Sequence, residues 1–142
     1  MTRSHIAFLG MTEKIETTIK IDGWDEKATQ EFEDGTKVAH AVVTLVEGND
    51  GLASGHMESV LYYTAGGTST YAGAIRLEAE LDGRTGAFTA VGEGGYDGTT
   101  ASSTMKIVEG TGDLAGITGT VSSSSTQEDY PNMPLTIDYQ LA

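Results

Sequence analysis

Two histidines and a glutamate are the first candidates for chemistry in this chain. His56 and Glu58 lie two residues apart in a stretch with strand character, so their side chains point to one face. Imidazole and carboxylate groups on one face would start a metal site, but no third ligand is evident at a suitable spacing. An exposed polar face is the simpler interpretation, so we assign no metal and no cofactor. His40 is predicted to point inward from another strand, either as a hydrogen-bonded core histidine or as a general base.

Other catalytic motifs give little evidence for an active site. The chain has no cysteine, which excludes a thiol nucleophile, a disulfide and a thiolate metal site. Serine is abundant, but no Gly-x-Ser-x-Gly nucleophile elbow occurs. The glycine-rich segment 92–95 precedes no predicted helix, so it indicates strand curvature rather than a phosphate-binding loop. Whether the protein is an enzyme therefore stays open at the level of the sequence.

Tyrosine and methionine side chains on the inward faces of predicted strands are the best candidates for a binding site. Surrounded by small residues, they suit a flexible and mostly apolar ligand, although they could equally fill the interior. If the interior performs a reaction, we expect a cyclisation or isomerisation of a folded substrate, with tyrosine hydroxyls or His40 as acid–base groups. The candidate ligand-binding residues are Met57, Tyr63, Tyr71, Phe88, Tyr96, Met105, Tyr139 and His40, with Trp24 near a rim.

A hairpin over residues 85–108 must position several of these side chains. Both arms alternate around Asp97-Gly98, a preferred type I′ turn in which both central residues need a positive φ. The inward face of this hairpin is apolar or small, and the outward face of its second arm is polar. The turn predicts the pairs Tyr96–Thr99, Gly94–Ala101, Gly92–Ser103, Ala90–Met105 and Phe88–Ile107.

The remaining chain continues the same pattern of strands and short turns. An acidic segment, residues 25–35, is predicted as a solvated loop, and the serine run 122–125 offers little side-chain packing. Eight short strands without an amphipathic helix predict an all-β fold, and sequential hairpins with strand glycines favour an eight-stranded antiparallel up-and-down β-barrel. Strands outside the hairpin are predicted over 14–21, 36–47, 54–64, 68–81, 117–126 and 135–141.

The strand 36–47 carries apolar residues on both faces, so its orientation is not fixed by alternation. We assign one face, which includes His40, to the interior. If this strand pairs with 54–64, an apolar patch lies on the outside, and such a patch predicts a homo-oligomer. The predicted patch consists of Val43, Leu45, Val60 and Tyr62.

Composition limits the partners and the location. A length of 142 residues suits one domain with its own core, which we place at 12–142 after an N-terminal extension at 1–11, with Met11 as an alternative start. The formal net charge of −13 disfavours nucleic acid and anionic membranes. The apolar runs are too short for a membrane helix or a signal peptide, so we expect a cytoplasmic protein.

Several short motifs occur along the chain: Trp24-Asp25-Glu26, Tyr71-Ala72-Gly73, the segments 81–88 and 110–119, and Leu135-Thr136-Ile137-Asp138-Tyr139. Together these motifs resemble a bacterial protein family of unknown function whose fold is similar to the allene oxide cyclase barrel. The resemblance covers about residues 12–141 and implies an eight-stranded, commonly oligomeric barrel. Related barrels in plant allene oxide cyclases, dirigent proteins and bacterial spirocyclases fold a reactive substrate, but none of their catalytic residues matches this chain.

Three hypotheses for function follow. The first is a barrel that binds a small, mostly apolar molecule in its lumen. The second is a cyclase or isomerase, which needs a polar group inside the lumen. The third is a filled barrel that serves as a structural or assembly module through its outer patch.

Overall fold

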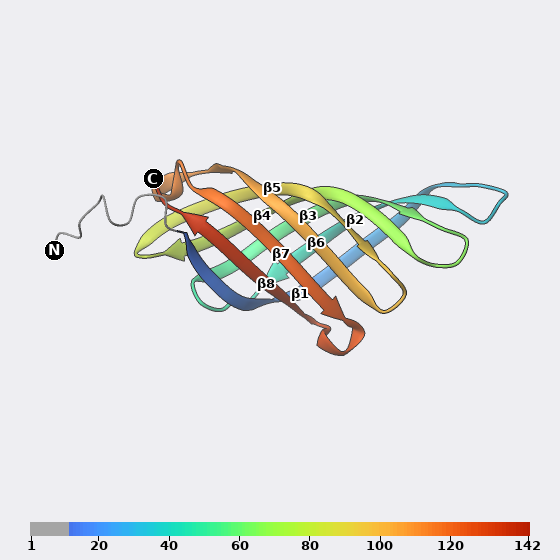
Figure 1. Ribbon diagram of the computed structural model, residues 1–142, viewed down its shortest axis with the longest axis horizontal. Coiled ribbons are helices and arrows are strands. Elements are labelled where there is room, and N and C mark those ends of the chain that lie inside the picture. Colours follow the sequence, from blue (N-terminus) through green and yellow to red (C-terminus); the bar gives the residue numbers. More distant parts are fainter. Residues whose placement is uncertain (1–11) are drawn as a thin grey trace.

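The computed structural model describes residues 12–142, which form a closed barrel of eight antiparallel strands (Figure 1). The predicted fold class is therefore confirmed, whereas the closer likeness to allene oxide cyclase stays a prediction. The predicted extension at 1–11, with Met11, lies outside the described residues. The strands are β1 (Glu13–Glu31), β2 (Lys37–Val46), β3 (Leu52–Tyr63), β4 (Ser69–Leu81), β5 (Arg84–Tyr96), β6 (Thr100–Gly110), β7 (Thr118–Thr126) and β8 (Asn132–Gln140).

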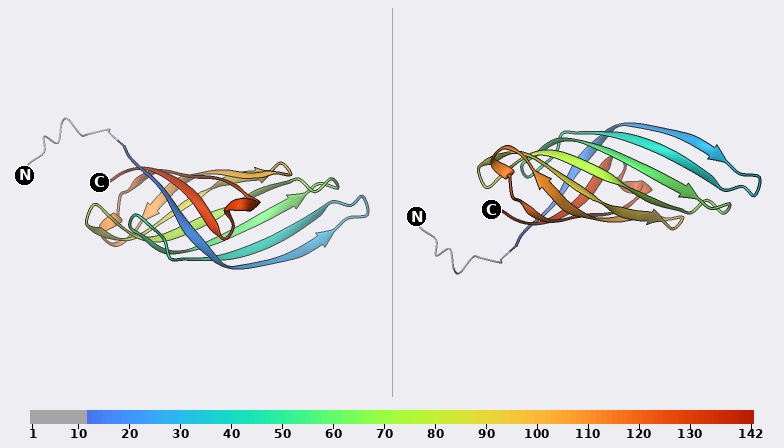
Figure 2. Two further views of the ribbon diagram at one scale, coloured as in Figure 1. Left: turned by 90° about the horizontal axis from the view of Figure 1, so that it is seen from below. Right: turned by 90° about the horizontal axis from the view of Figure 1, so that it is seen from above.

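Two short 3-10 turns, η1 (Gly112–Leu114) and η2 (Gln127–Asp129), interrupt the series of strands. The chain termini of the barrel lie at one end, with η1 and the β2–β3 and β4–β5 turns, and we call it the terminal end. The β1–β2, β3–β4 and β5–β6 turns and η2 lie at the opposite end, which we call the open end (Figures 1 and 2). Within residues 12–142 no helix is long and apolar enough to cross a membrane.

Strand β1 is much longer than the sequence predicts. It does not end at Ile21 but continues to Glu31, so the acidic segment predicted as a loop is largely strand. Its first part pairs with β8, and its second part pairs with β2 from Lys20 onward, with a register shift between Ile21 and Gly23. Most side chains of the second part are exposed as the β1–β2 hairpin extends from the open end (Figure 2). Acidic residues are tolerated there because they stay in water.

The β5–β6 hairpin exists, but its register differs from the prediction. Tyr96 pairs with Ala101 rather than Thr99, and Gly92 pairs with Met105. The Asp97 carboxylate accepts the backbone N–H groups of Thr99 and Thr100 at 2.9 and 2.8 Å, which places Asp97 before the turn and not at its centre. Of the turn residues, only Gly98 has a positive φ, 103°.

The register error leaves the inward face of this hairpin unchanged. Each pair is displaced by two residues, and side chains alternate with a period of two, so the predicted inward residues still point inward. A further shift between Thr89 and Ala90 pairs Phe88 with Gly110 instead of Ile107. By contrast, the Asp82-Gly83 turn before β5 has φ values of 52° and 79° and so matches the two positive angles of a type I′ turn.

The predicted orientation of β2 is wrong. Ala39, Ala41, Val43 and Leu45 are buried, and His40 and Thr44 are exposed. The sequence is apolar on both faces of this strand, so alternation could not decide its orientation. In the structure the small and branched side chains of Ala39, Ala41, Val43 and Leu45 fit the crowded interior, which leaves the imidazole of His40 in solvent.

The terminal end of the lumen is a packed hydrophobic core. Phe88 is 1% exposed, and Leu77 and Leu114 are fully buried. Leu114 comes from η1, and Thr111, the residue before η1, donates its backbone N–H to the Ala87 carbonyl of β5 at 2.8 Å. Met105 and Tyr139 belong to the same core. Burying side chains of this size contributes about 1.5–3 kcal/mol each to folding.

A glycine pair in the middle of the barrel lets neighbouring strands of the β3–β6 wall approach each other closely. Gly73 of β4 pairs with Gly92 of β5 and faces Ser59 of β3. A Cβ atom at Gly73 would overlap the carbonyl oxygen of Glu58 and lie 2.8 Å from Ser59 Cα. The backbone therefore has no room for a side chain at this position.

We predict that Gly73→Ala lowers the free energy of unfolding by about 1–3 kcal/mol, because the added methyl group forces the β3–β4 pair apart. Gly66→Ala in the β3–β4 turn is the matched control, since its added Cβ meets nothing closer than Thr64 Oγ1 at 3.9 Å. Chemical denaturation of both variants measures the difference. Equal stability of the two variants would contradict the close approach.

Candidate functional site

The lumen toward the open end holds a cavity of about 820 Å³, which we call the cup. Aromatic rings line it from Trp24, Tyr63, Tyr71, Tyr96 and Tyr130. Hydroxyl groups line it from Ser59, Ser69, Thr99, Ser103, Ser123, Ser125 and Thr126. Aliphatic and thioether groups come from Ile21, Met57, Leu61 and Met133. The barrel is therefore packed at one end and hollow at the other.

The register of the strands explains which side chains reach the cup. Leu61, Tyr71 and Gly94 are neighbours across β3, β4 and β5, and Ser103 and Ser123 continue the same row on β6 and β7. The ring of Tyr71 lies over Gly94, where a Cβ atom would come within 2.8 Å of Tyr71 Cε1. One row deeper, Met105 packs beside Gly92 and belongs to the core. The change from small serines to Met105 marks where the cup gives way to packed core.

The cup contains half of the predicted ligand-binding residues. Met57, Tyr63, Tyr71 and Tyr96 line the cavity, as does Trp24. The other four do not line it: Phe88, Met105 and Tyr139 are buried in the packed core, and His40 lies on the outside of the barrel. The lumen is thus neither wholly open nor wholly filled.

A hydrogen-bonded group of three side chains stands at the mouth of the cup. The Tyr63 hydroxyl donates to Glu26 Oε2 at 2.6 Å, and Trp24 Nε1 donates to Glu26 Oε1 at 3.1 Å. The ammonium group of Lys37 lies 4.8 Å from the centre of the Tyr63 ring. Burial, together with the hydrogen bond to Glu26 and its negative charge, raises the pKa of Tyr63 to about 12. Tyr63 therefore stays a neutral donor at physiological pH.

Two other tyrosine hydroxyls of the cup are also directed at protein acceptors. Tyr71 donates to the Ser102 carbonyl at 3.2 Å, and Tyr96 donates to the Gly98 carbonyl at 2.8 Å. Burial raises the pKa of Tyr71 above its ordinary value. Tyr63, Tyr71 and Tyr96 consequently present ring surface to the cavity, and their hydroxyl protons are occupied.

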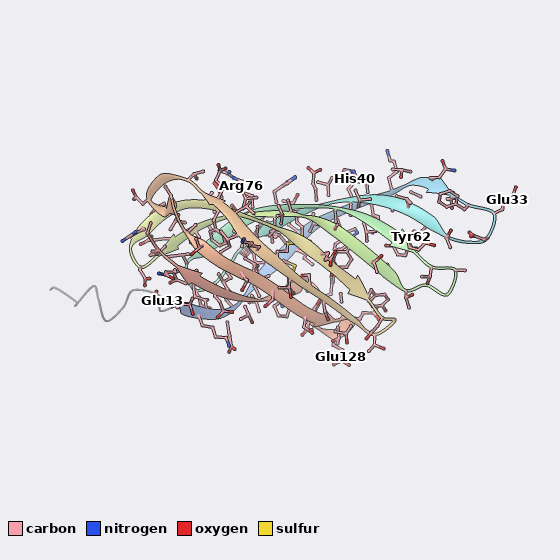
Figure 3. The ribbon with its side chains drawn as sticks, turned by 45° about the horizontal axis from the view of Figure 1, so that its top comes forward. Glu13, Glu33, His40, Tyr62, Arg76 and Glu128 are labelled. Carbon is pink, nitrogen blue, oxygen red and sulfur yellow. The ribbon has the colours of Figure 1, made fainter. Side chains whose placement is uncertain are left out.

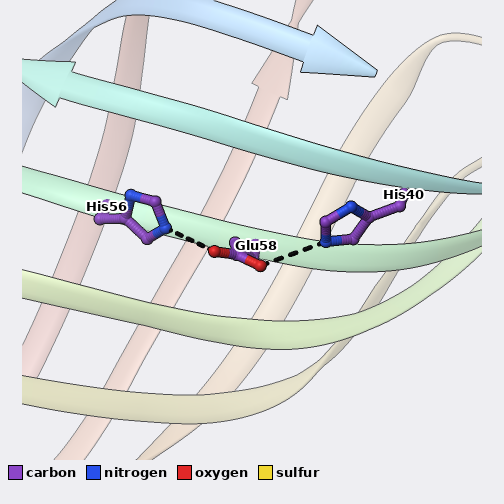
Figure 4. Close-up of polar contacts among 3 residues, drawn as sticks. All are labelled: His40, His56 and Glu58. Carbon is purple, nitrogen blue, oxygen red and sulfur yellow. Dashed lines mark hydrogen bonds and ion pairs between the residues drawn. The ribbon is translucent and has the colours of Figure 1, made fainter. Parts of the chain in front are cut away.

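A histidine–glutamate–histidine chain lies on the outer surface of β2 and β3 (Figure 4). His56 Nε2 is 2.8 Å from Glu58 Oε1, and His40 Nε2 is 3.1 Å from Glu58 Oε2. The hydrogen bonds from His56 and His40 lower the pKa of Glu58. The carboxylate sits between the two rings. Although these three side chains are adjacent, within residues 12–142 no group of three or more His, Asp or Glu side chains is arranged so that it could hold a metal ion. His40 was expected inside the lumen, and that expectation is wrong (Figure 3).

The predicted outer patch is only half correct. Val60 and Tyr62 are exposed at 56% and 44%, but Val43 and Leu45 are fully buried because β2 faces the other way. The outward neighbours of Val60 and Tyr62 on β2 are His40 and Val38. A shallow groove crosses this face between Val38 and Thr104. The homo-oligomer stays a prediction, with Val38, Val60 and Tyr62 in place of the original set.

Sequence reasoning missed the serine residues of the cup. Ser123 and Ser125 belong to the run that the sequence marks as weak in packing, and they point into the cavity from β7. A strand that is poor in large side chains within a barrel is a signal of hollow space, because nothing fills the lumen at that level. Trp24 also lies on β1 itself, whereas the sequence places it beyond a strand end.

The fold and the cup define a closed, eight-stranded up-and-down barrel with a cavity at one end of its lumen. The family model described as "Protein of unknown function (DUF3224)" matches residues 15–139, and the chain belongs to that family. No curated protein matches the chain.

A crystal structure of a protein of unknown function from the DUF3224 family of Shewanella oneidensis MR-1 is similar in fold. The TM-score is 0.69 at 19% sequence identity, and the alignment covers 92% of this chain and 99% of that one. At this identity the likeness concerns the barrel and not the residues of the cup.

We predict that the phenol of Tyr63 ionises near pH 12, about two units above the reference value of 10 for an exposed tyrosine. The folded state favours the neutral phenol, so its stabilising effect is present below pH 10 and is lost as the pH rises through 12. Ultraviolet titration of the wild type and of Tyr63→Phe measures this transition. Tyr62→Phe, which removes an exposed outer phenol, is the control, and a Tyr63 transition near pH 10 would contradict the buried hydrogen bond to Glu26.

Proposed function

We propose that the protein binds a small, mostly apolar molecule in the cup. The observation that carries this proposal is a cavity of about 820 Å³ lined by aromatic rings above a packed core. Ligand sites are typically concave, mostly apolar and about 300–1,000 Å³ in volume. An eight-stranded barrel is just wide enough to hold one small ligand.

The packed terminal end supports this assignment by fixing the depth of the site. Met57, Ile21 and Met133 line the cup where it meets the core, and Met133 is only 8% exposed. A ligand that enters from the open end would contact these side chains and lose its water shell. The free energy gained is roughly 25 cal/mol for each Å² of apolar surface buried.

A cyclase or isomerase is the second hypothesis, and the cup gives it less support. Its general acid or base was expected to be a tyrosine or His40. His40 is on the outer face, and the pKa values of Tyr63 and Tyr71 are raised, so both phenols are neutral at physiological pH. A neutral phenol donates a hydrogen bond but is a poor base. Holding a substrate in a reactive conformation would be the main contribution of such a site.

The structural module is the third hypothesis, and the hollow half of the lumen argues against it. A barrel that only provides an assembly surface gains stability by filling its interior, because voids cost packing contacts. This chain instead has serines and glycines around the cup. Self-association through the outer face and a cytoplasmic location stay separate proposals.

The neutral fluorophore N-phenyl-1-naphthylamine tests the proposal, because its emission rises when it leaves water. We predict saturable binding of one molecule per chain to the wild-type protein. Ser103→Trp, which places an indole in the cup, should weaken binding by at least about tenfold, equivalent to about 1.4 kcal/mol.

Ser124→Trp is the matched control, because Ser124 is an exposed serine on the outward face of β7. This variant should bind the fluorophore as the wild type does. Thermal melts confirm that both variants are folded. Absence of binding by the wild type, or equal binding by the two variants, would reject the cup as the binding site.

A further inference from the structure

The cup has a neutral lining in a strongly charged protein. The chain holds 8 basic and 21 acidic residues, yet the described side chains around the cup are aromatic, aliphatic, hydroxyl or amide groups. A charged ligand would lose water there without gaining an opposite charge, which is costly. The net charge of −13 also repels anions that approach the open end.

A cation is disfavoured for a different reason. Glu26 at the mouth already accepts hydrogen bonds from Tyr63 and Trp24. The ammonium of Lys37 already lies over the ring of Tyr63, at 4.8 Å from its centre. The carboxylate at the mouth therefore already accepts two hydrogen bonds, and one face of the Tyr63 ring already holds a cation.

The two rows of inward side chains around the cup differ from one side of the barrel to the other. The row nearest the open end runs through Tyr63, Ser69, Tyr96, Ala101 and Ser125 on β3 to β7. The next row carries Leu61 and Tyr71 on β3 and β4 but serines on β6 and β7. Strands four places apart in a closed ring of eight lie opposite each other, so the aromatic side on β3 faces the serine side on β7.

The hydroxyl groups of the cup also differ in whether they are already bonded. The hydroxyls of Tyr63, Tyr71 and Tyr96 all donate to protein acceptors. Ser123 donates to the Pro134 carbonyl at 2.5 Å. In the row nearest the open end, the two serines are Ser69 and Ser125. Within residues 12–142 no hydrogen bond ties their hydroxyls to another group, so both remain able to donate and accept.

We infer that the cup takes a neutral, flat molecule with an apolar ring face and with hydroxyl or carbonyl groups on its edge, as in hydroxylated aromatic compounds. The ring face lies against the tyrosines, where offset or edge-to-face contact is favourable. On its edge, one polar group bonds to Ser125 on the serine side, and another bonds to Ser69, which lies between Tyr63 and Tyr96 on β4. This inference rests on the proposed function and names the chemical class of its ligand.

Competition against bound N-phenyl-1-naphthylamine tests the inference with three compounds that share one ring system: naphthalene, 2,7-dihydroxynaphthalene and naphthalene-2-sulfonate. The diol should displace the fluorophore at a concentration about tenfold lower than naphthalene, as expected for two added hydrogen bonds. The sulfonate should need a concentration at least about tenfold higher than naphthalene, because its charge is unpaired in the cup.

The double variant Ser69→Ala/Ser125→Ala separates hydrogen bonding from shape. It should bring the diol to within about twofold of naphthalene and leave naphthalene itself unchanged, because only the edge contacts are lost. Ser124→Ala on the outer face is the control and should keep the wild-type preference for the diol over naphthalene.

The outcomes distinguish this inference from the proposed function. If the wild type binds the fluorophore but the sulfonate competes as well as the diol, the ligand class is wrong and the binding site stands. An unchanged diol preference in the double variant would likewise overturn the role of Ser69 and Ser125. If the wild type does not bind the fluorophore, the proposed function fails and this inference fails with it.

Discussion

Closure of the ring through β1 is the constraint on which the rest of the structure depends. The first part of β1 pairs with β8 from Glu13 to Lys20, and the second part pairs with β2 from Lys20 to Glu31. One strand therefore joins both edges of the sheet and closes the barrel wall, while its residues from Gly23 to Glu31 pair with β2 alone. The register shift between Ile21 and Gly23 lets the strand bend from one neighbour to the other. Without this closure the lumen would be an open groove, and the cup would not exist.

Side-chain size then divides the closed lumen into two parts. At the terminal end, Phe88, Leu77 and Leu114 fill the space completely. Toward the open end the rows change to Ser103, Ser123 and Gly94, which are too small to meet across the barrel. The filled core contributes folding free energy that a hollow site does not, so the packed half of the lumen stabilises the fold that contains the cavity. The hydrogen bonds of the tyrosines fix their rings at the wall of the cup.

The sequence predicted the barrel well because period-two alternation and turn residues are local signals. The Asp82-Gly83 turn and the inward face of β5 follow directly from them. The orientation of β2 could not be predicted, since both of its faces are apolar and only packing chooses between them. Likewise the exposed acidic half of β1 lacks an alternation of apolar and polar residues, so the sequence does not predict it as a strand. For the site, the aromatic side chains on inward faces correctly predicted Tyr63, Tyr71 and Tyr96. The sequence did not separate them from Phe88, Met105 and Tyr139, which lie deeper in the lumen, within the core. The depth of a side chain along the lumen depends on the register of its strand, which the sequence did not predict.

Three methionines report directly on the central claim that ligand enters the open half and stops at the packed half. Met57 and Met133 line the cup, and Met105 is 4% exposed within the core. With ¹³C-methyl-labelled methionine, titration with N-phenyl-1-naphthylamine should shift the methyl resonances of Met57 and Met133 and leave that of Met105 in place. Resonances that all stay fixed at saturating fluorophore, or a shift at Met105 alone, would contradict the account.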